Sequence, residues 1–327
     1  MLLKSARGGY CGPPALTPDT VSADKIIRLF VYENGEKIAS MRSLDDYIAQ
    51  AKHLVPAPQV LPQILPLLNQ PEVDTRMVVD LIAFNQTLTA NVLRLCNSAY
   101  YARGIRIDSL HGAVSLVGFR QIHDIVISVI SAAALTRPQS GYGVEANDLW
   151  GHSVATAVAA QIVARDCSAD QQIAFTAAIL HDIGKIVLSV ALEEVKDKVA
   201  LLTKTENLSP YEIEMKLLGV NHAETGGRLL EQWNLPEHLA GAVRYHHQPA
   251  AAKGNEPLAA CVHLGDFIAY LMGYGHGKHP LDLNARDEAL EILNLAPESI
   301  SQFKSESLRN LGLVKHLYNL KQFPSHQ

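Results

Sequence analysis

An adjacent histidine and aspartate lie inside one of the most apolar stretches of this 327-residue chain. His181 and Asp182 are flanked by Ala174–Leu180 and Ile183–Val190, whose composition and length predict a single buried helix. A buried imidazole or carboxylate is costly unless it is hydrogen-bonded, paired or bound to a metal ion. The chain must therefore fold so that other segments bring partners to this pair.

Most of the remaining sequence also predicts helices. From Val55 onward, apolar residues recur at spacings of three and four, with breaks at Gly118 and in the Pro- and Gly-containing segment 137–147. Ile26–Met41 differs, because alternating residues there flank Asn34-Gly35, a typical hairpin turn. We therefore predict an all-α helical bundle with a small N-terminal β-hairpin.

The same pattern predicts four regions along the chain. The expected divisions are an extension with the hairpin and a short helix over 1–54, an N-terminal helical half over 55–136, a helical core over 146–275, and C-terminal helices over 276–327. The His–Asp pair lies in the third region, so we expect the chemistry to lie there.

Composition limits the partners and the location. Lys and Arg total 28 against 33 for Asp and Glu, a net charge of −5, so we expect no nucleic-acid partner held by charge. The longest apolar stretch, Ile125–Leu135, is about half of the roughly 20 residues that a membrane span needs. The four cysteines include no CxxC pair, which favours a reducing, cytoplasmic setting with Cys96, Cys167 and Cys261 as buried apolar residues.

Further histidines and one further aspartate lie before and after this pair, on separate predicted helical segments. With the His–Asp pair they make seven positions: His152, His181, Asp182, His222, His246, His247 and Asp266. Four of them resemble the H…HD…D pattern of the HD superfamily of metal-dependent phosphohydrolases: His152, His181, Asp182 and Asp266. The three histidines between the His–Asp pair and Asp266, called the intermediate histidines below, resemble the HD-GYP group of cyclic di-GMP phosphodiesterases, as does Lys185. These histidines are His222, His246 and His247. After His247, however, the sequence reads Gln248-Pro249-Ala250 in place of the Gly-Tyr-Pro signature.

The first half resembles a different branch of the same superfamily. Val55–Pro58 before a leucine-rich helix, Asn97–Tyr101 after another, and the run Ile107–Gly118 are similar to the HDOD family, a bacterial signalling relative of HD-GYP. The resemblance covers about residues 55 to 270. Many HDOD members lack HD ligands and are regulatory or interaction modules, whereas this chain retains the full set.

The resemblance implies a dinuclear metal centre. Asp182 would bridge two ions, with His152 and Asp266 completing one site and the three intermediate histidines completing the other. Imidazole and carboxylate ligands favour Fe or Mn, with Ni or Zn as alternatives. A pair of such ions can clamp a phosphoryl group, and Lys185 could contact its oxygens. Asp182 and Lys185 are therefore the candidate catalytic residues.

Three more residues are candidates for supporting roles. Asp148, four residues before His152, could add a ligand or simply cap a helix. Glu224 or His263 could orient the ligands as hydrogen-bond partners.

Two functions fit this sequence. The first is a cytoplasmic signal-transduction protein with an occupied metal centre, which binds a signalling protein or a phosphate-containing small molecule. The second is an active metal-dependent phosphohydrolase or phosphodiesterase that acts on a nucleotide or cyclic nucleotide. The missing Gly-Tyr-Pro segment favours the first, and the intact ligands with Lys185 favour the second.

Overall fold

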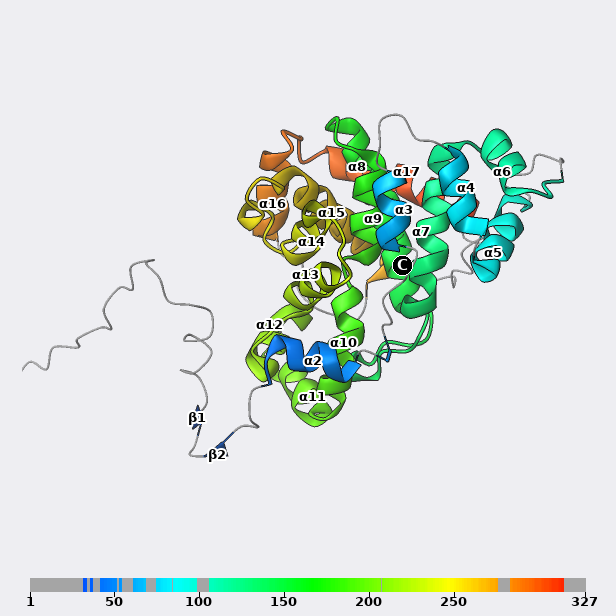
Figure 1. Ribbon diagram of the computed structural model, residues 1–327. Helices are drawn as coiled ribbons and strands as arrows, with labels where there is room; N and C mark the ends of the chain where they lie inside the picture. Colours follow the sequence, from blue (N-terminus) through cyan, green and yellow to red (C-terminus); the bar gives the residue numbers. More distant parts are fainter. Residues whose placement is uncertain are drawn as a thin grey trace, which may run out of the picture. The chain divides into compact units, whose positions relative to one another are not determined.

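The chain forms two compact units, Met1–Met41 and Arg42–Gln327. The computed structural model describes residues 32–33, 36–37, 42–51, 53–54, 61–68, 75–83, 85–98, 106–206, 208–275 and 283–314. In the first unit these are strands β1 (Tyr32–Glu33) and β2 (Glu36–Lys37), which pair antiparallel (Figure 1). The rest of the predicted hairpin lies outside the described residues, so the hairpin stays a prediction.

The helices and strands described in the second unit are all helices, which confirms the all-α prediction (Figure 1). Its first helices are α2 (Leu44–Ala51), α3 (Leu61–Leu68), α4 (Thr75–Ala83), α5 (Gln86–Cys96), α6 (Leu110–Val117) and α7 (Phe119–Leu135). Those that follow are α8 (Asp148–Asp166), α9 (Gln171–Leu180), α10 (Ile183–Glu193), α11 (Lys196–Thr205), α12 (Pro210–Leu218), α13 (His222–Gln232), α14 (Glu237–Arg244), α15 (Glu256–Ala269), α16 (Leu283–Ile292) and α17 (Ser299–Val314).

Helix α2 belongs to this second unit, although the sequence placed it in an extension over 1–54. Tyr47 and Ile48 are buried, and α2 packs against α10 and α13. Ion pairs hold its N-terminal end, because Arg42 lies 3.2 Å from Glu194 and Asp45 lies 3.0 Å from Arg228. The predicted region boundaries remain predictions.

The helix predicted through the His–Asp pair is broken at that pair. Helix α9 ends at Leu180 and α10 begins at Ile183, so the prediction of one continuous helix was wrong. Asp182 has φ −96° and ψ 9°, and its carbonyl accepts from the Lys185 N–H at 2.9 Å, a three-residue step. This conformation is typical of turns rather than of helix interiors. Asp182 occupies the N-cap position of α10, and His181 occupies the C-cap position of α9.

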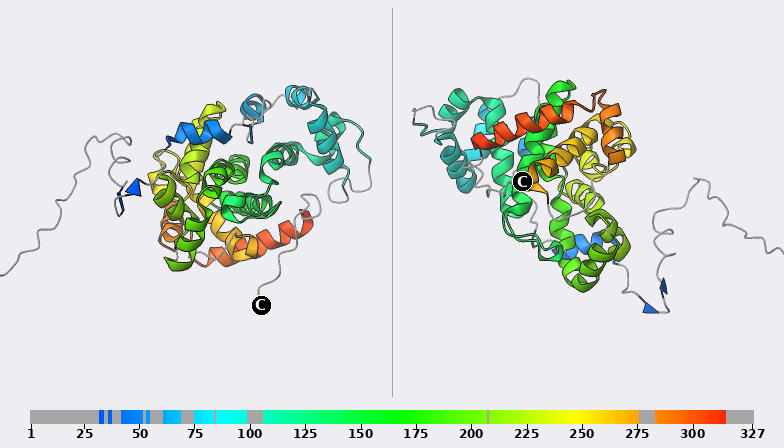
Figure 2. Two further views of the ribbon diagram at one scale, coloured as in Figure 1. Left: turned by 90° about the horizontal axis from the view of Figure 1, so that it is seen from below. Right: turned by 180° about the vertical axis from the view of Figure 1, so that it is seen from behind.

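Helices α8 and α15 form the centre of the unit. They pack along their length, and α17 lies across α8 (Figure 2). A Cβ on Gly265 of α15 would lie 2.7 Å from the Thr156 carbonyl of α8, so only glycine allows this spacing. The two helices therefore hold their side chains at fixed relative positions.

One described stretch, Gln171–Glu193, has the length and apolar character of a membrane span, and 83% of its most apolar window is buried inside the fold. It comprises α9, the His–Asp turn and α10. The apolar side chains of this stretch therefore pack in the protein core.

A second close contact joins α10 to α13. A Cβ on Gly184 would overlap the His222 carbonyl oxygen and would lie 2.7 Å from the Gly226 nitrogen. We expect Gly184→Ala to lower the free energy of unfolding by about 3 kcal/mol, since backbone atoms cannot move aside as side chains do. Urea denaturation followed by circular dichroism measures this change. Gly312→Ala on α17 is the control, because nothing lies near that Cβ; equal stability of the two variants would contradict the prediction.

Candidate metal centre

The structure brings together all seven residues predicted as ligands. They come from α8, the α9–α10 turn, the start of α13, the segment after α14, and α15. Their potential ligand atoms form three groups, each within 4.8 Å: His152, His181 and Asp266; His222, His246 and His247; and His181, Asp182 and His246. The first two groups match the two halves inferred from the sequence, and the third joins them.

Short distances define the first half. His152 Nε2 lies 3.2 Å from His181 Nε2 and 3.1 Å from Asp266 Oδ1. Asp182 Oδ2 lies 3.5 Å from His152 Nε2 and 3.4 Å from His181 Nε2. Three ring and carboxylate groups therefore surround one point next to Asp182.

The second half lies on the other side of the same carboxylate. His222 Nε2 is 3.3 Å from Asp182 Oδ1 and 2.9 Å from His247 Nε2. The ring of His246 lies between the halves, with its centroid 5.0 Å from that of His181 and 5.4 Å from that of His222. Asp182 thus presents one oxygen to each half, as expected for a bridging ligand.

The fold orients these rings through their Nδ1 atoms. His181 Nδ1 donates to the Ala178 carbonyl and His246 Nδ1 to the Val243 carbonyl, both at 2.7 Å. Each of these histidines follows a helix and reaches back three residues to a carbonyl of its last turn. Such bonds place the proton on Nδ1, so each Nε2 carries a lone pair that points toward the centre.

His152 is held in the same way, by the carbonyl of Tyr274 at 3.0 Å. The Nε2 atoms of His152 and His181 then face each other with lone pairs rather than with a donor and an acceptor. Asp182 Oδ1 and His246 Nε2 are buried without a hydrogen-bond partner within the described part of the chain. Divalent cations on either side of Asp182 would satisfy these atoms, so the residues present fit such metals.

Burial and neighbouring charges set the protonation states that a metal needs. Burial, reinforced by the neighbouring histidines, holds the pKa values of His246 and His247 well below the usual range. Burial alone would raise the pKa of Asp266, but its close contact with His152 and the nearby imidazoles hold that pKa well below its usual value. Neutral imidazoles and ionised carboxylates are the forms that bind metal ions.

Glu214 on α12 contacts the candidate centre, although no motif in the sequence indicated it. It is fully buried, and its carboxylate accepts from the His222 backbone N–H at 2.6 Å and from His222 Nδ1 at 2.8 Å. The Tyr142 hydroxyl donates to the same carboxylate at 2.8 Å. The available signal was an acid four residues before Leu218, on the buried face of an amphipathic helix.

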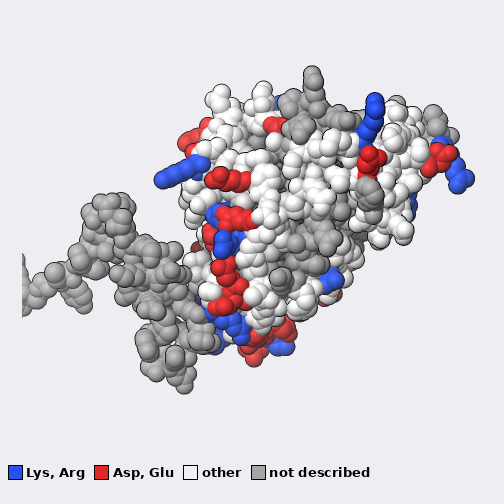
Figure 3. All heavy atoms as spheres, viewed as in Figure 1, with Lys and Arg blue, Asp and Glu red and all other residues white. Residues whose placement is uncertain are grey.

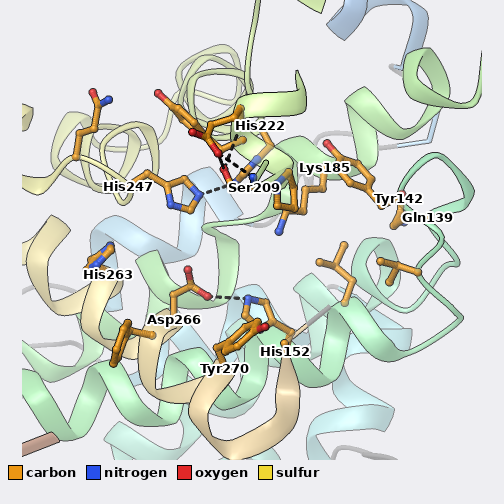
Figure 4. Close-up of a pocket in the computed structure, with 18 residues that line it drawn as sticks. Gln139, Tyr142, His152, Lys185, Ser209, His222, His247, His263, Asp266 and Tyr270 are labelled. Carbon is orange, nitrogen blue, oxygen red and sulfur yellow. Dashed lines mark hydrogen bonds and ion pairs between the residues drawn. The ribbon is translucent and has the colours of Figure 1, made fainter. Parts of the chain in front are cut away.

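The centre opens into a cavity of about 520 Å³ (Figure 4). The Lys185 ammonium donates to Asp182 Oδ2 at 2.7 Å and is the only Lys or Arg among the described residues that line the cavity. Burial lowers its pKa, but the neighbouring Asp182 outweighs burial and raises it, so the ammonium stays charged. Tyr142, Tyr211 and Tyr270 form part of the wall.

The three residues predicted to have supporting roles differ in their contacts with the centre. His263 Nδ1 donates to the His246 carbonyl at 2.8 Å, next to the centre. Glu224 pairs instead with Arg244 at 3.2 Å. Asp148 lies in the first turn of α8 and is in none of the three groups that the described residues form, which favours the helix-terminal role over that of a ligand.

An all-helical bundle around an ordered His and Asp cluster is the architecture expected of an HD-superfamily relative. The family model of the HDOD domain matches residues 54–249, and the chain belongs to this family. The resemblance inferred from the sequence is therefore confirmed.

Relatives of this chain support the fold. It is 28% identical over 248 residues to an uncharacterised protein of Treponema pallidum (strain Nichols), covering 74% of this chain and 47% of that protein, so the chain spans about half the length of this relative. A solved candidate signal-transduction protein from Marinobacter aquaeolei VT8 is 24% identical with a TM-score of 0.69, covering 91% of this chain and 64% of that one.

Two further solved structures have the same fold. A candidate phosphohydrolase from Shewanella amazonensis SB2B is 20% identical with a TM-score of 0.64, covering 84% of this chain and 98% of that one. An HDOD domain protein of unknown function from Geobacter sulfurreducens is 23% identical with a TM-score of 0.66, covering 84% and 99%. At these identities the likeness concerns the fold alone.

Proposed function

We propose that this chain is a signal-transduction protein that holds two divalent transition-metal ions, Fe or Mn first among them, and binds a phosphate-containing small molecule at them. The supporting observation is the convergence of lone pairs, with imidazoles and carboxylates aimed at two adjacent points on either side of Asp182. Mixed nitrogen and oxygen ligands suit these metals better than Ca or Mg.

The cavity favours a phosphate ester that carries a planar organic group. Lys185 can donate to a phosphate oxygen, while the wall offers aromatic rings and the amide side chains of Gln139 and Gln248. Acidic and basic side chains are interspersed on the face that Figure 3 presents, which favours a small molecule over a nucleic acid as the partner.

Hydrolysis of that ester is the second candidate function. Two ions in such a centre supply Lewis-acid activation of a phosphoryl group and of water. Lys185 is placed to steady negative charge on the phosphate, because its ammonium lies beside the bridging carboxylate and lines the cavity. A phosphodiester or phosphomonoester of a nucleoside is the substrate class that this reading favours.

Metal content is the first test. Protein purified without chelators and supplied with Mn or Fe should contain about two ions per chain by elemental analysis. His181→Ala should lose most of this metal, because that ring belongs to two of the three ligand groups. His111→Ala, an exposed histidine on α6, is the matched control and should keep full metal content. Equal metal content in both variants would show that the ligand assignment is wrong.

Activity separates the two functions. The metal-loaded protein is incubated with bis(p-nitrophenyl) phosphate, p-nitrophenyl phosphate and a set of cyclic nucleotides. Turnover that chelation abolishes and metal restores supports hydrolysis. Saturable, metal-dependent binding of one of these compounds without turnover supports the signalling function and excludes hydrolysis of that compound.

A further inference from the structure

Two cysteines from distant parts of the sequence lie together at the α8–α15 contact. The Sγ atoms of Cys167 and Cys261 are 3.7 Å apart, although 94 residues separate them in the chain. Cys167 follows the last residue of α8, and Cys261 lies on α15. A disulfide needs the sulfur atoms about 2.05 Å apart, which small side-chain rotations at this contact can supply.

The two thiols differ in access and in acidity. Cys167 is partly exposed, whereas Cys261 is buried. A hydrogen bond from the Cys261 thiol, together with the Ala169 backbone N–H, outweighs burial and lowers the pKa of Cys167 to about 7. The same contact, followed by burial, raises the pKa of Cys261. The accessible cysteine is therefore the better nucleophile, and the buried one lies within its reach.

We propose that Cys167 and Cys261 form a thiol oxidation site that peroxides convert into a reversible intramolecular disulfide. The Cys167 thiolate attacks one oxygen of hydrogen peroxide, the O–O bond breaks, and hydroxide leaves to become water, giving a sulfenic acid. The Cys261 sulfur then attacks that sulfur, forming the S–S bond and releasing a second water. In total, two thiols lose two electrons and two protons, and one peroxide becomes two waters.

The bond would join the helices that carry two of the candidate ligands. His152 lies in the first turns of α8, far along the helix from Cys167, and Asp266 lies five residues after Cys261 on α15. A disulfide here closes a long loop, and the loss of freedom in the unfolded chain raises stability. Oxidation should therefore stabilise the helix pair around the centre whether or not metal is bound there.

The test uses the full chain with Cys11, which lies outside the described residues, replaced by serine. After treatment with hydrogen peroxide, the intact mass should fall by two hydrogens. Peptide mapping without reductant should recover a linked peptide that contains Cys167 and Cys261. Dithiothreitol should reverse both changes, and the oxidised form should melt several degrees higher. Cys96 is the internal control, because burial raises the pKa of its thiol to about 11, and it should stay alkylatable after unfolding.

Two variants separate the roles. In Cys261→Ser the reaction should stop at the Cys167 sulfenic acid, which dimedone traps, and in Cys167→Ser the Cys261 thiol should remain unmodified. Alkylation of both cysteines in the peroxide-treated, unfolded parent protein overturns the proposal, as does the same mass loss in either variant. If a variant fails to fold, the peptide map of the parent protein decides alone.

Discussion

Asp182→Asn is expected to remove most of the metal from the protein. The carboxylate presents Oδ1 to the His222 side and Oδ2 to the His152 and His181 side, so one substitution weakens both halves. Loss of residues that merely orient ligands costs 10- to 100-fold in metal affinity, and we expect a fall of more than about 100-fold here. Titration with Mn after chelation, followed by calorimetry, measures the affinity.

Two companion variants isolate the cause. Asp148→Asn, a carboxylate one helical turn before His152, should keep the parental affinity; a comparable loss there would make Asp148 a ligand. The metal-free Asp182→Asn protein should also lose about 3 kcal/mol of stability, because the largely buried Lys185 is left without its ion-pair partner. The double variant with Lys185→Met should regain part of that stability but not the metal. Full metal binding by Asp182→Asn would exclude the bridging role.

Glu214→Gln is expected to have the second largest effect. The amide keeps the shape of the carboxylate but places an NH₂ group against the backbone N–H or Nδ1–H of His222, where two donors then face each other. His222 must turn or change tautomer, so we expect metal affinity to fall by about 10- to 100-fold. Stability should fall by about 2 kcal/mol, since hydrogen bonds to a buried charge are lost.

Graded controls fit this prediction. Tyr142→Phe removes one hydrogen bond to Glu214 and leaves both contacts with His222, so its effect should be less than tenfold on affinity and about 1 kcal/mol on stability. Glu206→Gln, an exposed acid paired with Lys216, should change neither quantity measurably. A Glu214→Gln protein that binds metal like the parent would show that the carboxylate does not position His222.

The sequence predicted which residues make up the centre, because candidate metal ligands can be recognised by residue type and by their order in the chain. Five histidines and two aspartates stand in the order for which the resemblance to the HD superfamily and the HD-GYP group implies a ligand set, even before the helices that carry them are placed. The helices themselves followed from apolar periodicity, which reports burial directly. The break at His181–Asp182 did not follow from it, because Leu180 and Ile183 are as apolar as a continuous helix requires.

The orientation of the ligand imidazole rings could not be predicted from the sequence either. The acceptors that turn each Nε2 inward are mostly backbone carbonyls, such as those of Ala178 and Tyr274, and a carbonyl is present at every residue. Glu214 shows the same difficulty, because its importance depends on α12 passing beside the first residue of α13. Such contacts depend on tertiary geometry, which periodicity and residue type do not encode.

The contact of Gly184 with His222 and Gly226 has a consequence for metal choice. Two backbones touch directly there, so the separation of the Asp182 turn from the start of α13 has almost no room to shrink. Ions of different radius, if held there, would then be accommodated by rotation of the imidazole rings about their Nδ1 hydrogen bonds rather than by movement of the helices. Exchange of one transition metal for another should consequently leave the helical frame in place and alter only the ring angles around it.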